Sequence, residues 1–191
     1  MIKKEIITIH AEAWRSEDNV HKYVWRKQWY EGLKEDKTGK LALVITIRPT
    51  NTSAFTEDLT SLLIEKNIRK LGFKGFVLVN LFSSIHAKSK ATFLKGSDEN
   101  TFEVISTILK EKRIGQIIFA CGSIVETNPL AMEQAKKIFT LLTAAQKEKA
   151  KLLCNGTTGK PAHPLSTQVR DQWVLDDVEK LFILEIGRAH V

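Results

Sequence analysis

The stretch LALVITIRPTNTSA, residues 41–54, decides the fold. Its first seven residues are apolar or β-branched and carry no charge, which is typical of a strand buried on both faces in a parallel sheet. The following residues are polar and rich in hydroxyl groups, and a helix signal comes next, with Thr56 as candidate N-cap and Glu57 and Asp58 in the first turn. Open α/β sheets bind ligands at such loops. The stretch predicts either the edge of a binding site or an ordinary connection between a strand and a helix.

The same alternation of buried strands with helices recurs along the chain. Apolar runs predict three further buried strands, and helical periodicity with cap signals predicts the helices between them. We expect the strands at residues 73–82, 116–121 and 151–154, and the helices at 57–71, at 102–109 and from Asn128-Pro129 onward. Four buried strands alternating with three helices are typical of an α/β fold, here a three-layer sandwich with a mainly parallel central sheet and helices on both faces.

A single domain is expected over residues 1–184. Residues 173–184 are expected to form a terminal element that packs back onto the domain. The last seven residues, EIGRAHV (185–191), read like a translated sequencing adaptor, so we interpret them as a non-native tail.

The segment NVHKYVWRKQWY, residues 19–30, alternates in the way that predicts a strand. A shorter strand is expected at residues 6–11. In a regular strand Tyr23, Trp25 and Trp29 would share one face. We expect these aromatic side chains to cover the edge of the sheet, and the alternative is that they stack on nucleobases.

Composition narrows the classes of function. The net charge of +7 suits a polyanionic partner such as a nucleic acid, although scattered lysines also fit a simply solvated surface. The chain has no apolar run of membrane-spanning length and no signal-peptide core, which predicts a cytoplasmic protein with no membrane partner. Cys121 and Cys154 lie in apolar runs and are expected to be buried free thiols.

Neither a cofactor nor a metal is predicted. The sequence contains no G-x-G-x-x-G motif, no P-loop and no G-x-S-x-G motif, which excludes dinucleotide oxidoreductases, ordinary NTPases and α/β-hydrolases. It also lacks the spacing of cysteines and histidines that marks a metal site.

Polar residues follow each predicted core strand. Because crossovers between parallel strands are right-handed, the four loops are expected on one rim at the carboxyl ends of the strands. Pro164 keeps His163 out of helical geometry, and this imidazole can donate to a carbonyl or an oxyanion, the alternative being a structural or merely exposed histidine. The candidate site residues are Arg48, Pro49, Thr50, Asn51, Ser53, Asn80, Gly122, Ser123, His163 and Pro164.

Several segments, in this order, carry a resemblance: HKYVWRKQW, VITIRPTNTSA, GFKGFVLVNLFSS, FACGS and GKPAHPLS. Over roughly residues 22–167 the chain resembles the domain-of-unknown-function 1643 family. That family is similar to the uracil-DNA glycosylase-like superfamily, whose hallmarks are a Pro-containing loop after the first core strand, an Asn or Ser at the end of a central strand, and a late His-Pro motif. The resemblance implies a uracil-DNA glycosylase-like fold.

The resemblance also implies roles for individual residues. His163 would stabilise the departing base as an oxyanion, and Asn80 would read the base. The family's first loop usually reads Asn-Pro-Ser-Thr, whereas this chain has Arg48-Pro49-Thr50-Asn51. An arginine cannot act as a base, although it binds phosphate well. Either Asn51 takes over the positioning of the attacking water, or hydrolysis is lost.

The sequence thus predicts a uracil-DNA glycosylase-like protein that recognises a nucleobase, a nucleotide or a nucleic acid at the strand-end cleft, where an N-glycosidic bond could be hydrolysed. One alternative is a catalytically inactive module that binds nucleic acid or nucleotide. The other is a hydrolase or transferase of small metabolites. Retention on single-stranded DNA that weakens with salt would separate the first two classes from the third.

Overall fold

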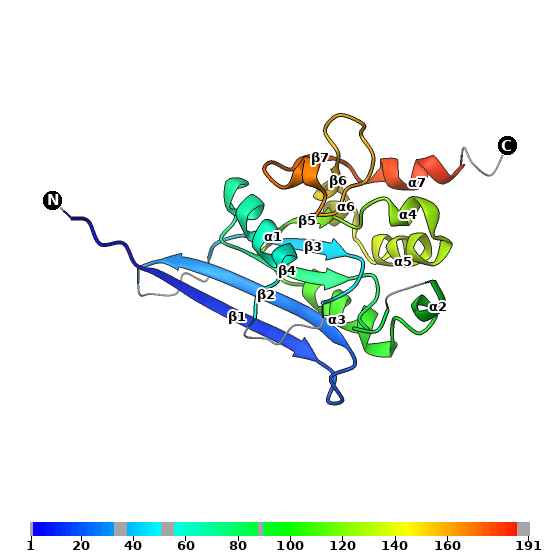
Figure 1. Ribbon diagram of the computed structural model, residues 1–191, viewed down its shortest axis with the longest axis horizontal. Helices are drawn as coiled ribbons and strands as arrows, with labels where there is room; N and C mark the ends of the chain where they lie inside the picture. The colour runs from blue at the N-terminus through cyan, green and yellow to red at the C-terminus, as the bar shows by residue number, and fades with distance from the viewer. Residues whose placement is uncertain (1, 33–37, 51–55, 88–89, 187–191) are drawn as a thin grey trace.

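A seven-stranded sheet forms the middle of the protein, with strand order β1-β2-β4-β3-β5-β6-β7 (Figure 1). The computed structural model describes residues 2–32, 38–50, 56–87 and 90–186. The strands are β1 (Ile7–Arg15), β2 (Lys22–Glu31), β3 (Leu41–Thr46), β4 (Gly75–Asn80), β5 (Ile114–Phe119), β6 (Ala150–Cys154) and β7 (Val174–Asp177). The four central strands, β4, β3, β5 and β6, are parallel, as predicted. Antiparallel strands extend the sheet on both sides.

The helices cover both faces of the sheet. They are α1 (Leu59–Lys70), α2 (Lys90–Phe93), α3 (Glu99–Leu109), α4 (Ile124–Thr127), α5 (Pro129–Thr140), α6 (Ala144–Glu148) and α7 (Glu179–Ile186), with a 3₁₀-helix at Thr167–Val169. Ile64 and Ile68 of α1 pack on one face of the sheet. Ile105 of α3 and Ile138 of α5 pack on the other. The prediction of an α/β fold with a parallel centre and helices on both faces is therefore confirmed.

Strand β3 lies at the centre because every one of its side chains is buried. Leu43 and Ile45 belong to the core beneath α3 and α5, whereas Ala42 and Val44 belong to the core beneath α1. A strand with apolar residues on both faces is stable only between two layers, which explains why this run decides the fold.

The start of α1 differs from the prediction. Asp58 is the N-cap, because its Oδ1 accepts a hydrogen bond from the backbone N–H of Ser61 at 2.7 Å, so Thr56 does not cap this helix. The predicted Asn128-Pro129 cap of α5 is confirmed, since the Asn128 side chain accepts from the backbone N–H groups of Leu130 and Ala131.

Strand β2 contains a bulge that the alternating sequence does not reveal. Trp14 of β1 pairs with Val24, but the next residue, Arg15, pairs with Lys22, so β2 has one residue more than its partner. Tyr23 consequently packs in the core beneath α3, whereas Trp25 and Trp29 pack in the core beneath α1. The prediction that all three share one face is wrong for Tyr23. Strand β1 also covers the outer side of β2, so these aromatic residues lie inside the sheet rather than at its edge.

The carboxyl-terminal part of the domain adds β7 and α7. The predicted terminal element is thus a strand followed by a helix, and Trp173 is buried just before it. Helix α7 continues to Ile186, two residues into the segment interpreted as a tail. Cys121 and Cys154 are buried and free, as predicted. Within the described residues, no helix has the length and apolar character needed to cross a bilayer.

Candidate functional site

A cavity of about 480 Å³ opens at the carboxyl ends of the parallel strands. Its walls come from the segments after β3, β5 and β6, from the end of β4, from the start of β2 and from the first turn of α1. Seven of the ten candidate site residues line it, namely Arg48, Pro49, Thr50, Asn80, Gly122, Ser123 and His163. Asn51 and Ser53 lie outside the described residues. Pro164 is buried and is not part of the cavity wall. The structure thus brings these seven residues together, while their roles stay predictions.

His163 presents a neutral hydrogen-bond donor. Its Nδ1 accepts a hydrogen bond from the backbone N–H of Leu165 at 3.2 Å. In a neutral imidazole the other nitrogen, Nε2, then carries the proton. Burial, with a further contribution from the positive charge of Arg48, lowers the pKa of His163 from 6.5 to about 4, although Asp58 acts in the opposite direction. At neutral pH the cavity wall therefore contains an uncharged Nε2–H donor.

The position of His163 depends on a glycine in the neighbouring loop. Gly122 follows β5 with a φ of 71°, and its backbone N–H donates to the carbonyl of Ala162 at 3.1 Å. A Cβ atom built on Gly122 would lie 3.1 Å from the Cβ of His163. This close approach of two backbones is the reason that a glycine occupies the position.

Replacing Gly122 with alanine is expected to destabilise the protein and to displace His163. The left-handed backbone alone costs a side chain about 1–3 kcal/mol. The matched control is Gly159→Ala, because Gly159 has a similar φ of 68° but no heavy atom within 4 Å of its built Cβ. Denaturant unfolding should show a loss of stability in both variants. An NMR titration should show a changed His163 pKa in Gly122→Ala only, and an unchanged pKa there would contradict the close-approach argument.

Asn80 offers amide donors to the cavity. Its Oδ1 accepts a hydrogen bond from the Thr46 hydroxyl at 2.7 Å, which fixes the orientation of the side-chain amide. Its Nδ2 donates to none of the described residues. The residue is 5% exposed, and a buried amide normally uses both of its N–H groups. Because Asn80 lines the cavity, a ligand oxygen there can accept from these N–H groups.

Asp58 is the one acidic residue among the described residues that line the cavity. Its Oδ1 caps α1, and its Oδ2 accepts a hydrogen bond from the Thr50 hydroxyl. The carboxylate is thus held between the loop after β3 and the start of α1. Sequence reasoning placed Asp58 inside the first turn of the helix and so missed its position at the cavity.

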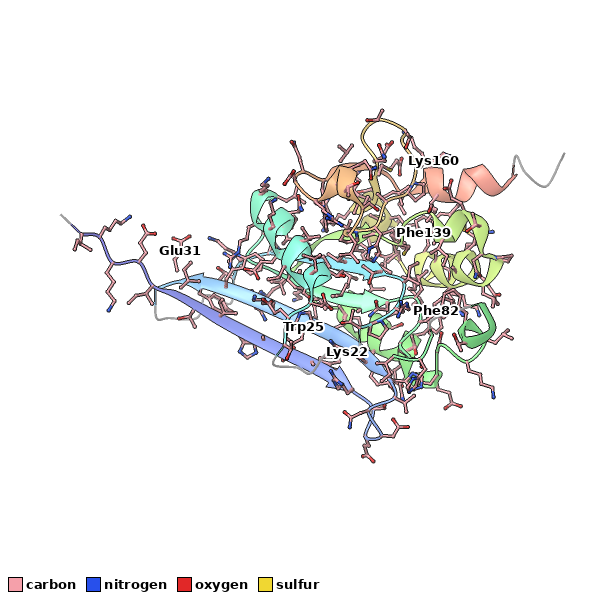
Figure 2. The ribbon with its side chains drawn as sticks, viewed as in Figure 1. Lys22, Trp25, Glu31, Phe82, Phe139 and Lys160 are labelled. Carbon is pink, nitrogen blue, oxygen red and sulfur yellow. The ribbon has the colours of Figure 1, made fainter. Side chains whose placement is uncertain are left out.

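Lys22 and Trp25 also line the cavity, and sequence reasoning did not assign either of them to the site. Figure 2 shows both side chains on β2. The Lys22 Nζ lies 5.4 Å from the centre of the Trp25 ring, and the two residues are 7% and 6% exposed. Burial and then the positive charge of Arg15 lower the pKa of Lys22, and Asp58 partly opposes them.

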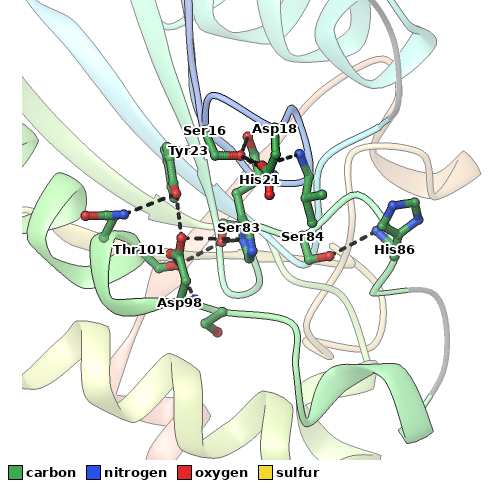
Figure 3. Close-up of polar contacts among 12 residues, drawn as sticks. Ser16, Asp18, His21, Tyr23, Ser83, Ser84, His86, Asp98 and Thr101 are labelled. Atoms are coloured by element: carbon green, nitrogen blue, oxygen red, sulfur yellow. Dashed lines mark hydrogen bonds and ion pairs between the residues drawn. The ribbon is translucent and has the colours of Figure 1, made fainter.

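A second polar cluster lies between the start of β2 and the start of α3 (Figure 3). It contains the residue types of a serine triad, because His21 Nδ1 lies 2.7 Å from Ser83 Oγ and 3.9 Å from an Asp98 carboxylate oxygen. A triad needs the serine on the opposite imidazole nitrogen, whereas here Nδ1 faces both partners. Ser83 is also only 1% exposed and bonds to Thr101. The cluster therefore stabilises the junction of β2 with α3, where Asp98 caps the helix.

Fold and cavity together define an α/β protein with a ligand-sized strand-end pocket lined by neutral donors and basic side chains. The chain belongs to the DUF1643 family, since the family model, described as a protein of unknown function, matches residues 22–165. The match runs from Lys22 to Leu165 and so covers nearly the whole pocket. Comparison with curated proteins and comparison with solved structures each gave no match. Among the residues described, no group of three or more His, Cys, Asp or Glu side chains could hold a metal ion.

Proposed function

We propose that this protein is a uracil-DNA glycosylase-like hydrolase that recognises a nucleobase, in a nucleotide or a nucleic acid, in the strand-end pocket and cleaves its N-glycosidic bond. The observation that carries the proposal is the neutral His163 imidazole, which presents an Nε2–H donor in a pocket that also contains the Asn80 amide. The pocket volume of about 480 Å³ lies in the usual range for small-molecule sites.

The chemistry follows from the charge that develops when a base departs. Breaking the bond between the base and C1′ of the sugar leaves negative charge on the base, which is spread onto its carbonyl oxygen. A preorganised donor such as the His163 Nε2–H stabilises this charge without first giving up a proton. The Asn80 amide is suited to hold a carbonyl oxygen of the base, because its own oxygen is occupied by Thr46.

A water molecule must attack C1′ in this mechanism, leaving its hydroxyl on the sugar while its proton goes to the departed base anion, and the pocket needs an acceptor that orients this water. Asn51 is the residue proposed from the sequence for this task, and it lies outside the described residues. Asp58 is a second candidate, because its carboxylate lines the pocket and carboxylate oxygens can accept more than one hydrogen bond each. Arg48 is exposed beside it and is suited to hold a phosphate of the ligand.

Arg48 also favours a second candidate function, a binding module without catalysis. This arginine occupies the position where the family's first loop usually has an Asn, and a guanidinium cannot accept a hydrogen bond from water. A protein of this kind would bind the same ligands in the same pocket and would release no base.

The test uses the purified protein with uridine, inosine and their 5′-monophosphates, and with single-stranded oligonucleotides that contain uracil or hypoxanthine. Calorimetry measures binding, and chromatography measures free base. Binding together with base release is the expected result. Binding without release would replace the hydrolase by the binding module, and the absence of both would overturn nucleobase recognition.

A further inference from the structure

Two lysines on β2 are equally buried but differ in their partners. As whole residues, Lys22 and Lys27 are each 7% exposed. The Lys27 Nζ lies 2.5 Å from a carboxylate oxygen of Glu57 and 2.5 Å from one of Glu65. The Lys22 Nζ makes neither a hydrogen bond nor an ion pair with any residue that the structure describes. An ammonium group that is largely withdrawn from water and has no ion-pair partner is costly, so such groups are rare unless a partner is supplied from elsewhere.

The bulge in β2 explains why Lys22 reaches the pocket. In a regular strand, side chains three residues apart point to opposite faces. The extra residue at Tyr23 turns Lys22 to the face of Trp25, over whose ring its Nζ lies. Bulges re-aim side chains in this way next to functional sites. The chain thus directs an unpaired amine into the pocket by a specific feature of its backbone.

The strand order separates Lys22 from His163. In the order β2-β4-β3-β5-β6, Lys22 is on the first strand and His163 follows the last. The loop that carries His163 packs against the segment after β5, where a Cβ built on Gly122 would lie 3.1 Å from the Cβ of His163. The cationic side chain of Lys22 and the neutral donor of His163 thus come to the pocket from different strands, and the charge of Asp58 acts on both. Asn80, at the end of β4, is on the strand next to Lys22.

We propose that Lys22 is an anion-binding subsite of the pocket, and that the ligand carries a phosphate or carboxylate group that enters the pocket and pairs with the Lys22 Nζ. This inference rests on the proposed function, since it names a further property of the same ligand. The anion would pair directly with the amine, which no described residue does, since Asp58 acts on Lys22 without forming a hydrogen bond or an ion pair with it. The lowered pKa of Lys22 agrees with this arrangement, because an anion beside the amine would favour its charged form and so oppose the lowering caused by burial.

The burial of Lys22 also limits the class of ligand. The phosphates of a nucleic-acid strand run across the rim of a pocket, where the exposed Arg48 can reach them. A lysine that is only 7% exposed as a whole residue is reached instead by a group inside the pocket. Two sources fit this chemistry, the terminal phosphate of a free nucleotide and an acidic substituent on the base.

The test compares neutral and anionic forms of one ligand. Uridine is the neutral probe, uridine 5′-monophosphate carries the phosphate, and 5-carboxyuridine carries an acidic group on the base, with inosine and its 5′-monophosphate as the purine pair. We expect calorimetry to show at least one anionic form binding about 10-fold or more tightly than its neutral parent. The form that gains affinity identifies the source of the anion. In Lys22→Met the ratio of the two Kd values should fall to about one, and in Lys22→Arg the preference should persist.

Thermal unfolding separates this inference from a structural role of Lys22. Replacing an unpaired buried amine by the isosteric Met side chain should leave the melting temperature unchanged or raise it. A melting temperature several degrees lower would mean that Lys22 stabilises the fold, and the inference would be wrong. It would also be overturned by neutral and anionic forms that bind equally to the parent protein. Base release from uridine or inosine with no anionic preference would remove the Lys22 subsite and leave the proposed function standing.

Discussion

Replacing His163 with alanine is expected to lower base release about 100-fold or more, the usual loss when one preorganised donor at a developing anion is removed. The melting temperature should change little. The only hydrogen bond that the imidazole makes to a described residue is the one from the backbone N–H of Leu165, and this group is exposed enough for water to replace the lost acceptor. Chromatography of the free base checks the expected fall in base release, and thermal unfolding of the same preparations checks the melting temperature.

Two further variants separate the Nε2–H donor from the Nδ1 acceptor. The side-chain oxygen of His163→Asn can occupy the place of Nδ1 and accept from Leu165, but its amide ends short of Nε2. The longer side chain of His163→Gln can bring an N–H group close to the position of Nε2. We therefore expect more base release from His163→Gln than from His163→Asn. Equal activity of His163→Asn and the parent protein would mean that the imidazole only anchors its loop.

The pH dependence gives an independent readout of the same residue. Because the pKa of His163 in the folded protein is about 4, the imidazole is neutral throughout the range from pH 5 to pH 8. Base release should therefore show no loss from protonation of His163 between pH 8 and pH 5. In the unfolded chain this histidine titrates near 6.5, so the unfolded state binds more protons between about pH 4 and 6.5, and folding stability falls as the pH falls through that window. The claim that His163 is neutral would be wrong if base release fell as the pH dropped through about 6.5 in the parent protein but not in His163→Gln.

The strands of the parallel core could be predicted because each can be recognised from its own sequence, without knowing which strand it pairs with. Residues 41–46 are buried on both faces, and an uncharged run of this length fits few other environments. Once the strands were assigned, topology alone put their carboxyl ends on one edge, so Arg48, Asn80 and His163 could be expected in one place. All three line the pocket.

The β2 side of the pocket could not be predicted in the same way. Regular alternation puts Lys22 and Trp25 on opposite faces, and the bulge that reverses this depends on the register between β1 and β2. The register depends on how two segments pair and pack, so it cannot be read from the sequence of one segment alone. The cap of α1 is a similar case, because Thr56 and Asp58 both suit the position. In the structure Asp58 is the cap, and its carboxylate also accepts a hydrogen bond from Thr50 in the preceding loop.

The second large effect is expected at Lys27, which fastens β2 to α1. Its side chain is 9% exposed and pairs with Glu57, 30% exposed, and with Glu65, 16% exposed. Burial alone would lower the pKa of Lys27 and raise that of Glu65. The hydrogen bonds of Lys27 with Glu57 and Glu65 outweigh burial and raise the pKa of Lys27. The hydrogen bonds of Glu65 with Lys27 and Arg69 likewise lower the pKa of Glu65. Since β2 carries Lys22 and Trp25 and α1 is capped by Asp58, this cluster joins two walls of the pocket.

Replacing Lys27 with methionine removes one partner of a buried pair and leaves the carboxylates behind, which costs about 3 kcal/mol. For a protein of this size such a loss should lower the melting temperature by about 6–12 °C. The control is Lys66→Met on α1, which breaks the exposed pair of Lys66 with Asp171 and should cost about 1 kcal/mol or less.

Because the pKa of Glu65 is lowered in the folded state, its contribution to stability is present above its ordinary pKa of 4.5 and is lost as the pH falls through its folded pKa. The difference in unfolding free energy between the parent and Lys27→Met should therefore be largest near neutral pH and shrink below pH 4.5. A difference that stays constant down to pH 3 would show that Lys27 stabilises the fold through packing of its alkyl chain and not through its charge.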